Sequence, residues 1–423
     1  MRTVNLERRM KFNLRTCVIA ALFGAFPVGA AMAQVPAGVT CTKSPTGDDA
    51  NEPHPVCNVK PVVTHGPYIS APTDTSVIIV WMTDLPSSAM VVYGDDGKLD
   101  KQAIPSKDGL VDVGTLHAVR LTGLTPGRKY QYRVGSTPVL ELAAYWPKTG
   151  ETLESDTYSF TTFDTHKLEV SFVSITDTHE DLHRIDSLKM KIDWSKIDFL
   201  VHTGDCTNWV ASEAQLWRKC LDPLIDSGLQ HSTPLIFARG NHDTRGAYAR
   251  ELSRDIPIEG ERFYYTRDDG PLHLIIIDTG EDKSDTTQVY AGLNQMQAYH
   301  DQELAWLKQE PQSSKRAHDA PFRVLLMHQP RWGWLGNGDP TAARAEWTAA
   351  ANAANVDLVI AGHTHRFSLT PAGSPLGNNY PILVVGQGDV AKVDATATSL
   401  HVTVVAQDGS VRTDFVLPRA ARH

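Results

Sequence analysis

Three short stretches decide the fold: Phe199-Leu-Val-His-Thr-Gly-Asp205, Pro234-Leu-Ile-Phe-Ala-Arg-Gly-Asn-His-Asp243 and Leu358-Val-Ile-Ala-Gly-His-Thr-His365. Each begins as an apolar run of strand length and ends in a glycine followed by carboxylate, amide or imidazole side chains. Apolar strands that alternate with helical stretches indicate a layered α/β domain. In such a domain ligands gather where the strands end. The sequence therefore predicts a site built from residues that directly follow strands.

The same alternation extends over residues 164–423, which we predict to form one α/β domain. We expect strands at 169–175, 199–202, 234–238, 272–278, 323–327 and 357–361. We expect helices near 182–192, 213–229, 293–308 and 341–354. The apolar residues of the second helix recur at helical spacing, which predicts one buried face.

Oxygen and imidazole side chains follow five of these strands. They are Asp177, His179, Asp205, Asn241, His328, His363 and His365. A single carboxylate at a strand end is usually solvated, and a single histidine is usually a surface or core residue. All five groups in one chain, each at a strand end, are better explained as metal ligands. The sequence thus predicts a metal centre that only folding can assemble.

The order D-x-H, G-D, G-N-H-D, a lone histidine and G-H-x-H resembles the calcineurin-like metallophosphoesterase superfamily, over roughly residues 168–420. The resemblance implies a four-layer αββα sandwich with two metals at the strand ends. It implies that the first metal is held by Asp177, His179 and His365. The second would be held by Asn241, His328 and His363, with Asp205 bridging both. Imidazole and carboxylate ligands together suit two divalent or mixed-valence ions of Mn, Zn or Fe.

Such a centre hydrolyses phosphate esters with a metal-activated hydroxide, because two ions clamp the attacking and leaving oxygens. His242 follows a ligand, and the resemblance implies that it faces the substrate. It is the candidate catalytic residue, which would stabilise the transition state or protonate the leaving oxygen. Simple packing is the alternative for His242. Asp243 either orients it or is solvated.

The position three residues after Asp205 separates the branches of the superfamily. Purple acid phosphatases place a metal-binding tyrosine there, and phosphoprotein phosphatases place an aspartate that orients the catalytic histidine. This chain has Asn208, which supplies neither a phenolate nor a charge and so implies a colourless protein. Asn208 together with His179 looks like the branch that holds cyclic-nucleotide and glycerophosphodiester phosphodiesterases. Phosphomonoesters and phosphodiesters therefore both stay open as substrates.

Residues 62–163 have a different pattern, typical of an all-β domain. We expect short strands at 76–81, 89–93, 117–121, 129–134 and 157–162, separated by turn residues such as Asp95-Asp96-Gly97. This spacing predicts a β-sandwich. The stretch 121–134 resembles a fibronectin type III domain, in the version that precedes the catalytic domain of purple acid phosphatases. The resemblance implies a spacer or a wall beside the site.

Residues 1–33 have the layout of a secretory signal peptide: a basic start, an apolar run and Ala31-Met32-Ala33 before Gln34. We expect a periplasmic or secreted protein, with no membrane contact once the signal is removed. Residues 34–61 would then be an N-terminal extension. Four cysteines remain, and the pairs Cys41–Cys57 and Cys206–Cys220 are the simplest of three connectivities, with free thiols as the alternative.

The formal net charge favours some classes of substrate and partner over others. Removal of residues 1–33 takes away five basic side chains and one acidic one, which lowers the formal net charge from −9 to −13. An acidic chain is a poor partner for nucleic acid, so small phosphate esters are favoured as substrates. Side chains beside the motifs are candidate substrate contacts: Asn208, Trp209, Arg239 and Arg331 first, then Arg245, Arg366, Trp332 and Trp334. The oligomeric state is open.

A second class of function also fits the domain order. A sandwich joined to an inactive enzyme scaffold would serve as a non-catalytic surface or adhesion protein. All seven expected ligands and His242 are present, which favours the enzyme.

Overall fold

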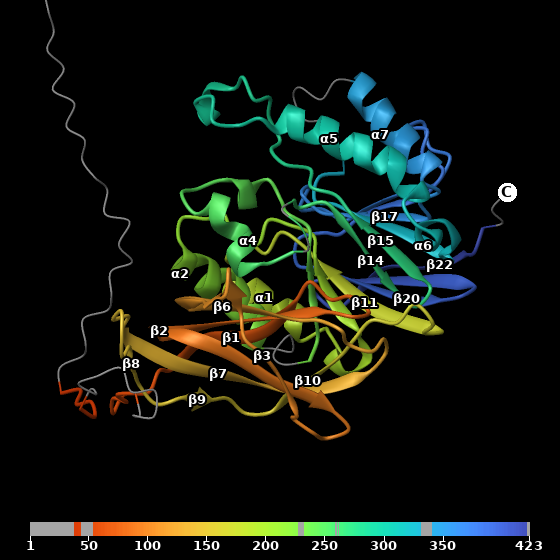
Figure 1. Ribbon diagram of the computed structural model, residues 1–423. Helices are drawn as coiled ribbons and strands as arrows, with labels where there is room; N and C mark the ends of the chain where they lie inside the picture. The colour runs from red at the N-terminus through yellow and green to blue at the C-terminus, as the bar shows by residue number, and fades with distance from the viewer. Residues whose placement is uncertain are drawn as a thin grey trace, which may run out of the picture.

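The structure is a computed structural model that describes residues 38–43, 54–226, 232–258, 260, 262–330 and 341–420. The predicted signal peptide, Arg331, Trp332 and Trp334 lie outside these residues. Figure 1 shows the front β-sandwich at one end of the molecule and the α/β domain at the other.

The front domain is all-β, as predicted. Its main strands are β1 (Val63–Ser70), β2 (Val77–Asp95), β3 (Lys101–Ala103), β6 (Val113–Leu121), β7 (Lys129–Glu141) and β10 (Tyr158–Thr161). Shorter strands are β4 (Ser106–Lys107), β5 (Leu110–Val111), β8 (Lys148–Thr149) and β9 (Leu153–Glu154). Alternate side chains of β2, β6 and β7 meet in a core of their own, around Trp81, Tyr130 and Tyr132.

One front-domain prediction was wrong. The strands expected at 76–81 and 89–93 are two parts of the single strand β2, which changes its main partner halfway. Its first part pairs with β6 up to Met82 and, after an irregularity, again at Ser87 and Ser88. Its second part pairs with β7 from Ser87 onward. Pro86 lies in the gap and has no N–H to donate to a neighbour. The ladder is interrupted there, but the chain stays extended.

The α/β domain contains two sheets. One continues the front-domain sheet through β13 (Leu235–Phe237), β12 (Phe199–His202), β11 (Glu169–Ile175), β20 (Val390–Thr396), β21 (Ser399–Val405) and β22 (Val411–Pro418). The other has the order β14 (Tyr265–Asp269), β15 (Leu272–Ile276), β16 (Phe322–Leu326), β17 (Leu358–Ala361), β19 (Ile382–Val384) and β18 (Ser368–Thr370). The strands predicted at 169–175 and 199–202 have those bounds. β14 and the strands after β17 were not predicted.

Helices cover the outer faces of both sheets. They are α1 (Leu182–Lys189), α2 (Glu213–Leu216), α3 (Asp222–Leu224), α4 (Leu252–Asp255), α5 (Met296–Gln309), α6 (Lys315–Asp319) and α7 (Thr341–Ala353). The helix predicted over 213–229 contains a π-helical turn, Trp217–Leu221, between α2 and α3. Pro223 explains it, since it lacks the N–H that would bond the carbonyl four residues earlier.

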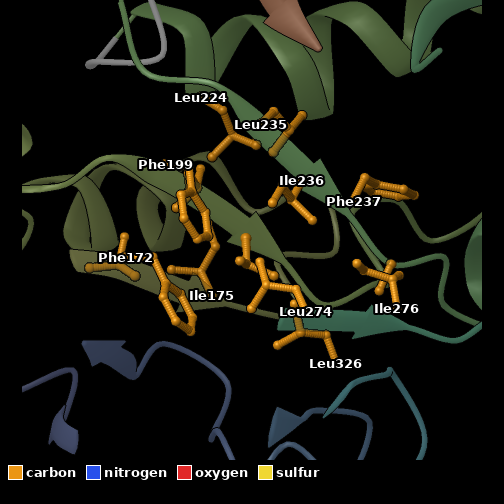
Figure 2. Close-up of a cluster of buried hydrophobic side chains, with 14 of the residues drawn as sticks. Phe172, Ile175, Phe199, Leu224, Leu235, Ile236, Phe237, Leu274, Ile276 and Leu326 are labelled. Atoms are coloured by element: carbon orange, nitrogen blue, oxygen red, sulfur yellow. The ribbon is translucent and has the colours of Figure 1, made fainter. Parts of the chain in front are cut away.

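Alternating side chains build the layers. Leu274 and Ile276 of β15 point into the core between the two sheets, beside Ile175 of β11 (Figure 2). Their neighbours Ile275 and Ile277 point the other way and pack in the cluster that contains residues of α5 and α7. The layers are therefore helix, sheet, sheet and helix, which confirms the predicted αββα sandwich. Among the described residues, no helix is long and apolar enough to span a bilayer.

The two domains share one sheet, and some front-domain residues, such as Tyr68, also pack in the core of the α/β domain. Ser70 of β1 pairs in parallel with Leu235 of β13, so a front-domain strand continues the sheet of the α/β domain. The Ser70 hydroxyl also donates to the Pro257 carbonyl at 2.7 Å, and the buried hydroxyl of Tyr68 donates to the Asp255 carbonyl. The front domain is thus fixed against the domain that carries the site.

Candidate metal centre

The predicted ligands meet between the carboxyl ends of the two sheets. Asp177, Asp205 and Asn241 follow β11, β12 and β13, three neighbouring parallel strands of the first sheet. His328 and His363 follow β16 and β17, which are neighbours in the second sheet. Because parallel strands end at the same edge, this topology brings residues from distant parts of the chain together.

One half of the centre contains Asp177, His179 and His365. The Nε2 atoms of the two histidines lie 3.1 Å apart. Each also faces the Asp177 carboxylate, at 3.7 Å from Oδ1 for His179 and 3.3 Å for His365. One ligand atom from each of the three residues lies within 4.8 Å of the others, which is the spacing of donors around one ion.

The other half contains Asp205, His328, His363 and Asn241. His328 Nε2 is 3.0 Å from Asp205 Oδ2, and ligand atoms of Asp205, His328 and His363 again lie within 4.8 Å of one another. The side-chain amide oxygen of Asn241, Oδ1, lies 3.0 Å from His363 Nδ1. Asp205 Oδ2 is also 3.8 Å from His179 Nε2, so this carboxylate lies between the two halves.

Two buried atoms fit the presence of a cation. Among the described residues, Asp177 Oδ1 and His328 Nε2 are fully enclosed and lack a hydrogen-bond partner. An unsatisfied buried polar atom is costly, and both atoms are metal donors that point into the cluster. Carboxylate, amide and imidazole donors together match a transition-metal centre better than an all-oxygen calcium or magnesium site. The residues present therefore fit the expected ions.

The backbone at the centre is strained where the ligands are. Asp177, His179, Asp205, His363 and His365 all have positive φ, between 47° and 72°. This conformation costs a residue with a Cβ about 1 kcal/mol or more, and it concentrates at functional sites. Gly240 is needed for a related reason, since a Cβ there would lie 2.3 Å from the Asp205 nitrogen. The preference of non-glycine residues for negative φ is overridden here, because the ligands must converge on one centre.

The two carboxylates dominate the electrostatics. Burial raises the pKa of Asp177, but the facing imidazoles of His179 and His365 outweigh it and lower this pKa below its usual range. Burial alone would lower the pKa of His328, but the nearby Asp205 charge raises it to about 9. At His363, burial and the His328 charge lower the pKa to about 4. The carboxylates thus draw a proton onto His328, and a bound cation would take the place of that proton.

Asp243 supports the ligand loops. Its buried carboxylate accepts hydrogen bonds from the backbone N–H groups of Asp205 at 2.8 Å and Gly240 at 3.0 Å. Burial, followed by the Asp205 charge, raises the pKa of Asp243 to about 6. The sequence left two roles open for Asp243, to orient His242 or to be solvated. The structure shows neither, because its oxygens accept hydrogen bonds from main-chain groups and the side chain is buried.

His242 lies beside the metal cluster with a fixed ring orientation. A ring nitrogen of His242 lies within 4.8 Å of ligand atoms of His179 and Asp205. Its Nδ1 is 2.7 Å from the Asn208 carbonyl oxygen, so Nδ1 carries a proton and donates it. The Asn208 side chain donates instead to the His179 carbonyl, at 3.2 Å. The His242 ring is therefore oriented by the Asn208 backbone and not by the Asn208 side chain.

Three predicted substrate contacts have clear positions. Arg239 is largely buried, with its side chain 14% exposed, and pairs with Asp278 at 2.5 Å, with its guanidinium 4.4 Å from the centre of the Phe263 ring. Its charge is therefore engaged by a buried carboxylate. The Trp209 side chain is exposed next to Asn208, and Arg366 is exposed beside His365.

Sequence reasoning missed several contributors. Glu281 and Asp282 bind the Arg245 guanidinium, whose Nη1 is 3.3 Å from His242 Nε2. Gln387 donates to the Asp177 carbonyl at 3.0 Å. No local motif marks these residues, because each acts through a contact between distant segments.

Two family descriptions match the chain. Residues 66–162 match "Purple acid Phosphatase, N-terminal domain", and residues 170–367 match "Calcineurin-like phosphoesterase". The chain therefore carries a region that matches calcineurin-like phosphoesterases behind a region that matches the N-terminal domain of purple acid phosphatases. Both resemblances read from the motifs are confirmed.

More particularly, the chain is similar to purple acid phosphatases. It is 24% identical over 371 residues to purple acid phosphatase 23 of Arabidopsis thaliana, which covers 76% of this chain and 74% of that protein. It is 25% identical over 298 residues to acid phosphatase type 7 of Mus musculus, which covers 65% of this chain. The matched region spans 60% of the length of the mouse protein.

Solved structures agree on the fold. The purple acid phosphatase PPD1 of yellow lupin matches with a TM-score of 0.63 and 17% identity, and covers 85% of this chain and 74% of that one. A structure of PhoD matches with a TM-score of 0.57 and 12% identity, and covers 84% of this chain and 90% of that one. These two structures therefore share the fold of this chain.

Proposed function

We propose that this protein is an exported hydrolase of small phosphate esters that uses two transition-metal ions of Mn, Zn or Fe. The observation that carries the proposal is the convergence of all seven predicted ligands on one centre with two unsatisfied buried donor atoms. The similarity to acid phosphatases supports the same reaction class.

The ligand assignment divides the residues into two groups of three around a shared carboxylate. Asp177, His179 and His365 would hold one ion. Asn241, His328 and His363 would hold the other, with Asp205 as the bridge. When bound, the ions supply Lewis acidity and lower the pKa of a coordinated water to near neutrality.

His242 would assist the leaving group. Its Nδ1 proton is engaged by the Asn208 carbonyl, so Nε2 is the ring atom available to the substrate. A proton placed on Nε2 can pass to the leaving oxygen as the ester bond breaks. The backbone contact fixes the ring plane, which reduces the reorganisation required in the transition state.

Turnover of two chromogenic esters tests this function. We expect the protein reconstituted with Mn or Zn to hydrolyse p-nitrophenyl phosphate, and the rate on bis-p-nitrophenyl phosphate to decide between monoester and diester preference. A chelator should abolish both rates. Protein that binds two metals yet hydrolyses neither ester would instead be the non-catalytic surface protein that the domain order also permits.

Export rests on separate observations. Both expected disulfides form, Cys41–Cys57 and Cys206–Cys220, and structural disulfides persist mainly in oxidising compartments. We therefore propose a periplasmic or secreted protein whose mature chain begins at Gln34. N-terminal sequencing of the exported protein tests this, and a chain that begins at residue 1 would contradict it.

A further inference from the structure

Arg245 lies at the edge of the metal centre, outside the ligand set. It follows the short 3₁₀ turn His242–Thr244, and its backbone carbonyl accepts from the Val210 N–H at 2.7 Å. This contact and the His242–Asn208 contact hold two loops side by side. The Arg245 side chain therefore begins at a fixed point three residues after His242.

An acidic clamp, defined as Glu281 and Asp282, holds one side of the guanidinium. Arg245 Nε lies 2.9 Å from Glu281 Oε1, and Nη2 lies 2.6 Å from Glu281 Oε2 and 3.0 Å from Asp282 Oδ1. The Tyr290 hydroxyl donates to Glu281 Oε2 at 2.9 Å. The Glu281 side chain is only 1% exposed, whereas that of Arg245 is 27% exposed. A buried clamp thus orients a guanidinium that solvent still reaches.

The remaining side of the guanidinium faces the centre. The clamp contacts involve Nε and Nη2 of Arg245. The third nitrogen, Nη1, lies 3.3 Å from His242 Nε2. His242 in turn contacts His179 edge-on, with ring centres 4.9 Å apart. Nη1 and His242 Nε2 are thus neighbouring polar atoms at the rim of the same cluster. A guanidinium that is held by one edge and turns its other amino group toward the centre is well suited to a phosphate oxygen.

We propose that Arg245 binds a terminal oxygen of the substrate's phosphoryl group through Nη1, and that the acidic clamp positions it for this contact. The proposal rests on the proposed function, since it concerns the same site. The two clamp carboxylates offset the charge of Arg245, so its contribution is a directed hydrogen bond and not long-range attraction. The same contact would bind inorganic phosphate, the product.

Arg239 and Arg366 are poorer candidates for this contact. The Arg239 guanidinium is buried and bound to Asp278. Arg366 is exposed, and among the described residues no buried carboxylate holds it as Glu281 holds Arg245. Arg245 is the arginine that is both held and directed toward His242.

Binding of inorganic phosphate tests the proposal separately from turnover. In metal-reconstituted protein, Arg245→Met removes the donors but keeps much of the side-chain length. We expect the phosphate Kd by calorimetry and the KM for p-nitrophenyl phosphate each to rise roughly 10–100-fold, the scale of a lost charged hydrogen bond. The kcat should fall less than the KM rises. Arg218→Met is the matched control, because Arg218 is exposed and donates to Ala214 of its own helix.

Two further variants separate contact from fold. Arg245→Lys keeps a cation for the clamp but loses the planar set of guanidinium donors. We therefore expect its phosphate affinity to lie between that of the wild type and that of Arg245→Met. Glu281→Gln loosens the clamp and should also weaken phosphate binding, with metal content unchanged. If Arg245→Met does not fold, Arg245→Lys decides the question.

Unchanged phosphate Kd and KM in Arg245→Lys and in any folded Arg245→Met would overturn this proposal and leave the proposed function intact. Wild-type protein that binds phosphate, loses it in Arg245→Met and yet hydrolyses neither ester would have the opposite meaning. In that case the phosphate contact stands and the catalytic function fails.

Discussion

The front sandwich and the α/β domain use similar strands for different purposes. In the sandwich, inward side chains such as Trp81 and Tyr132 fill a core, and the Trp81 indole N–H is satisfied by Ser136 at 3.0 Å. In the α/β domain the strands end in residues with positive φ and in buried atoms without partners. Every potential metal cluster found among the described residues lies in this second domain. The convergence of metal-ligating side chains at the strand ends thus separates the chemical region from the structural one.

The largest expected effect comes from the bridge between the two halves of the centre. Asp205→Ala removes the carboxylate that contacts His179 and His328, so two cations would face each other without an anion between them. We expect loss of at least one metal and a fall in turnover of roughly 10⁴-fold or more.

Metal analysis and kinetics measure both quantities. Asp414→Ala is the control, because Asp414 is a half-exposed partner of His401 on the outer strands. Two metals retained in Asp205→Ala would show that this carboxylate is not the bridge.

His242→Ala should separate catalysis from metal binding. The His242 ring is oriented by a backbone carbonyl, and the proposed function assigns it to the substrate and not to the metals. We expect about two metals per chain and a turnover lowered by roughly 10²–10⁴-fold, the usual scale of general acid–base assistance.

The loss should be smaller for p-nitrophenyl phosphate than for an alkyl phosphate, because a good leaving group needs no proton. Metal loss in His242→Ala, or wild-type turnover on the alkyl ester, would refute the assigned role.

The two disulfides allow a direct comparison of the regions. Cys206–Cys220 joins the residue after Asp205 to the π-helical turn, and both cysteines are buried. Replacing both by serine should weaken metal affinity roughly 10–100-fold, the scale of disturbing groups behind the ligands.

Cys41–Cys57 lies in the N-terminal extension, so its double serine variant is the control and should bind metal normally. Metal titration of both variants measures the difference. Equal affinities would mean that the bond beside Asp205 does not support the centre.

The smallest effects should come from two buried histidines, one in each region. Burial lowers the pKa of His117 in the sandwich to about 4, so the folded state prefers it neutral. Its contribution is complete above pH 6.5 and is lost as the pH falls toward 4, by about 1–2 kcal/mol at pH 5. His273 behaves oppositely. Burial would lower its pKa, but the hydrogen-bonded carboxylates of Asp268 and Glu310 raise it. Arg316 forms an ion pair with the same Asp268 carboxylate.

The contribution of His273 is therefore complete below its unfolded pKa and is lost as the pH rises through its folded pKa. Urea unfolding between pH 5 and pH 8 measures both slopes. His117→Gln should flatten the acid side and His273→Gln the alkaline side. If the free energy of unfolding changed with pH equally in the wild type and in both variants, the protonation states assigned to His117 and His273 would be wrong.

The strand ends and their ligands were predictable, because an apolar run followed by glycine and a polar side chain is a local pattern. Contacts between distant segments were not. The partner of β20 is β11, more than two hundred residues earlier, and alternation alone does not name it. The role of Asn208 rests on its carbonyl oxygen, which every residue has. The continuity of β2 was missed because the residues between the two β-rich runs at 76–81 and 89–93 carry no β-rich pattern of their own, although the chain stays extended through them.

The central claim is that seven side chains hold two ions around Asp205. Anomalous diffraction from crystals of the Zn-reconstituted protein tests it most directly. The account predicts two peaks, one beside Asp177, His179 and His365 and one beside Asn241, His328 and His363, with the Asp205 carboxylate between them. A single peak, or two peaks that Asp205 does not join, would contradict it.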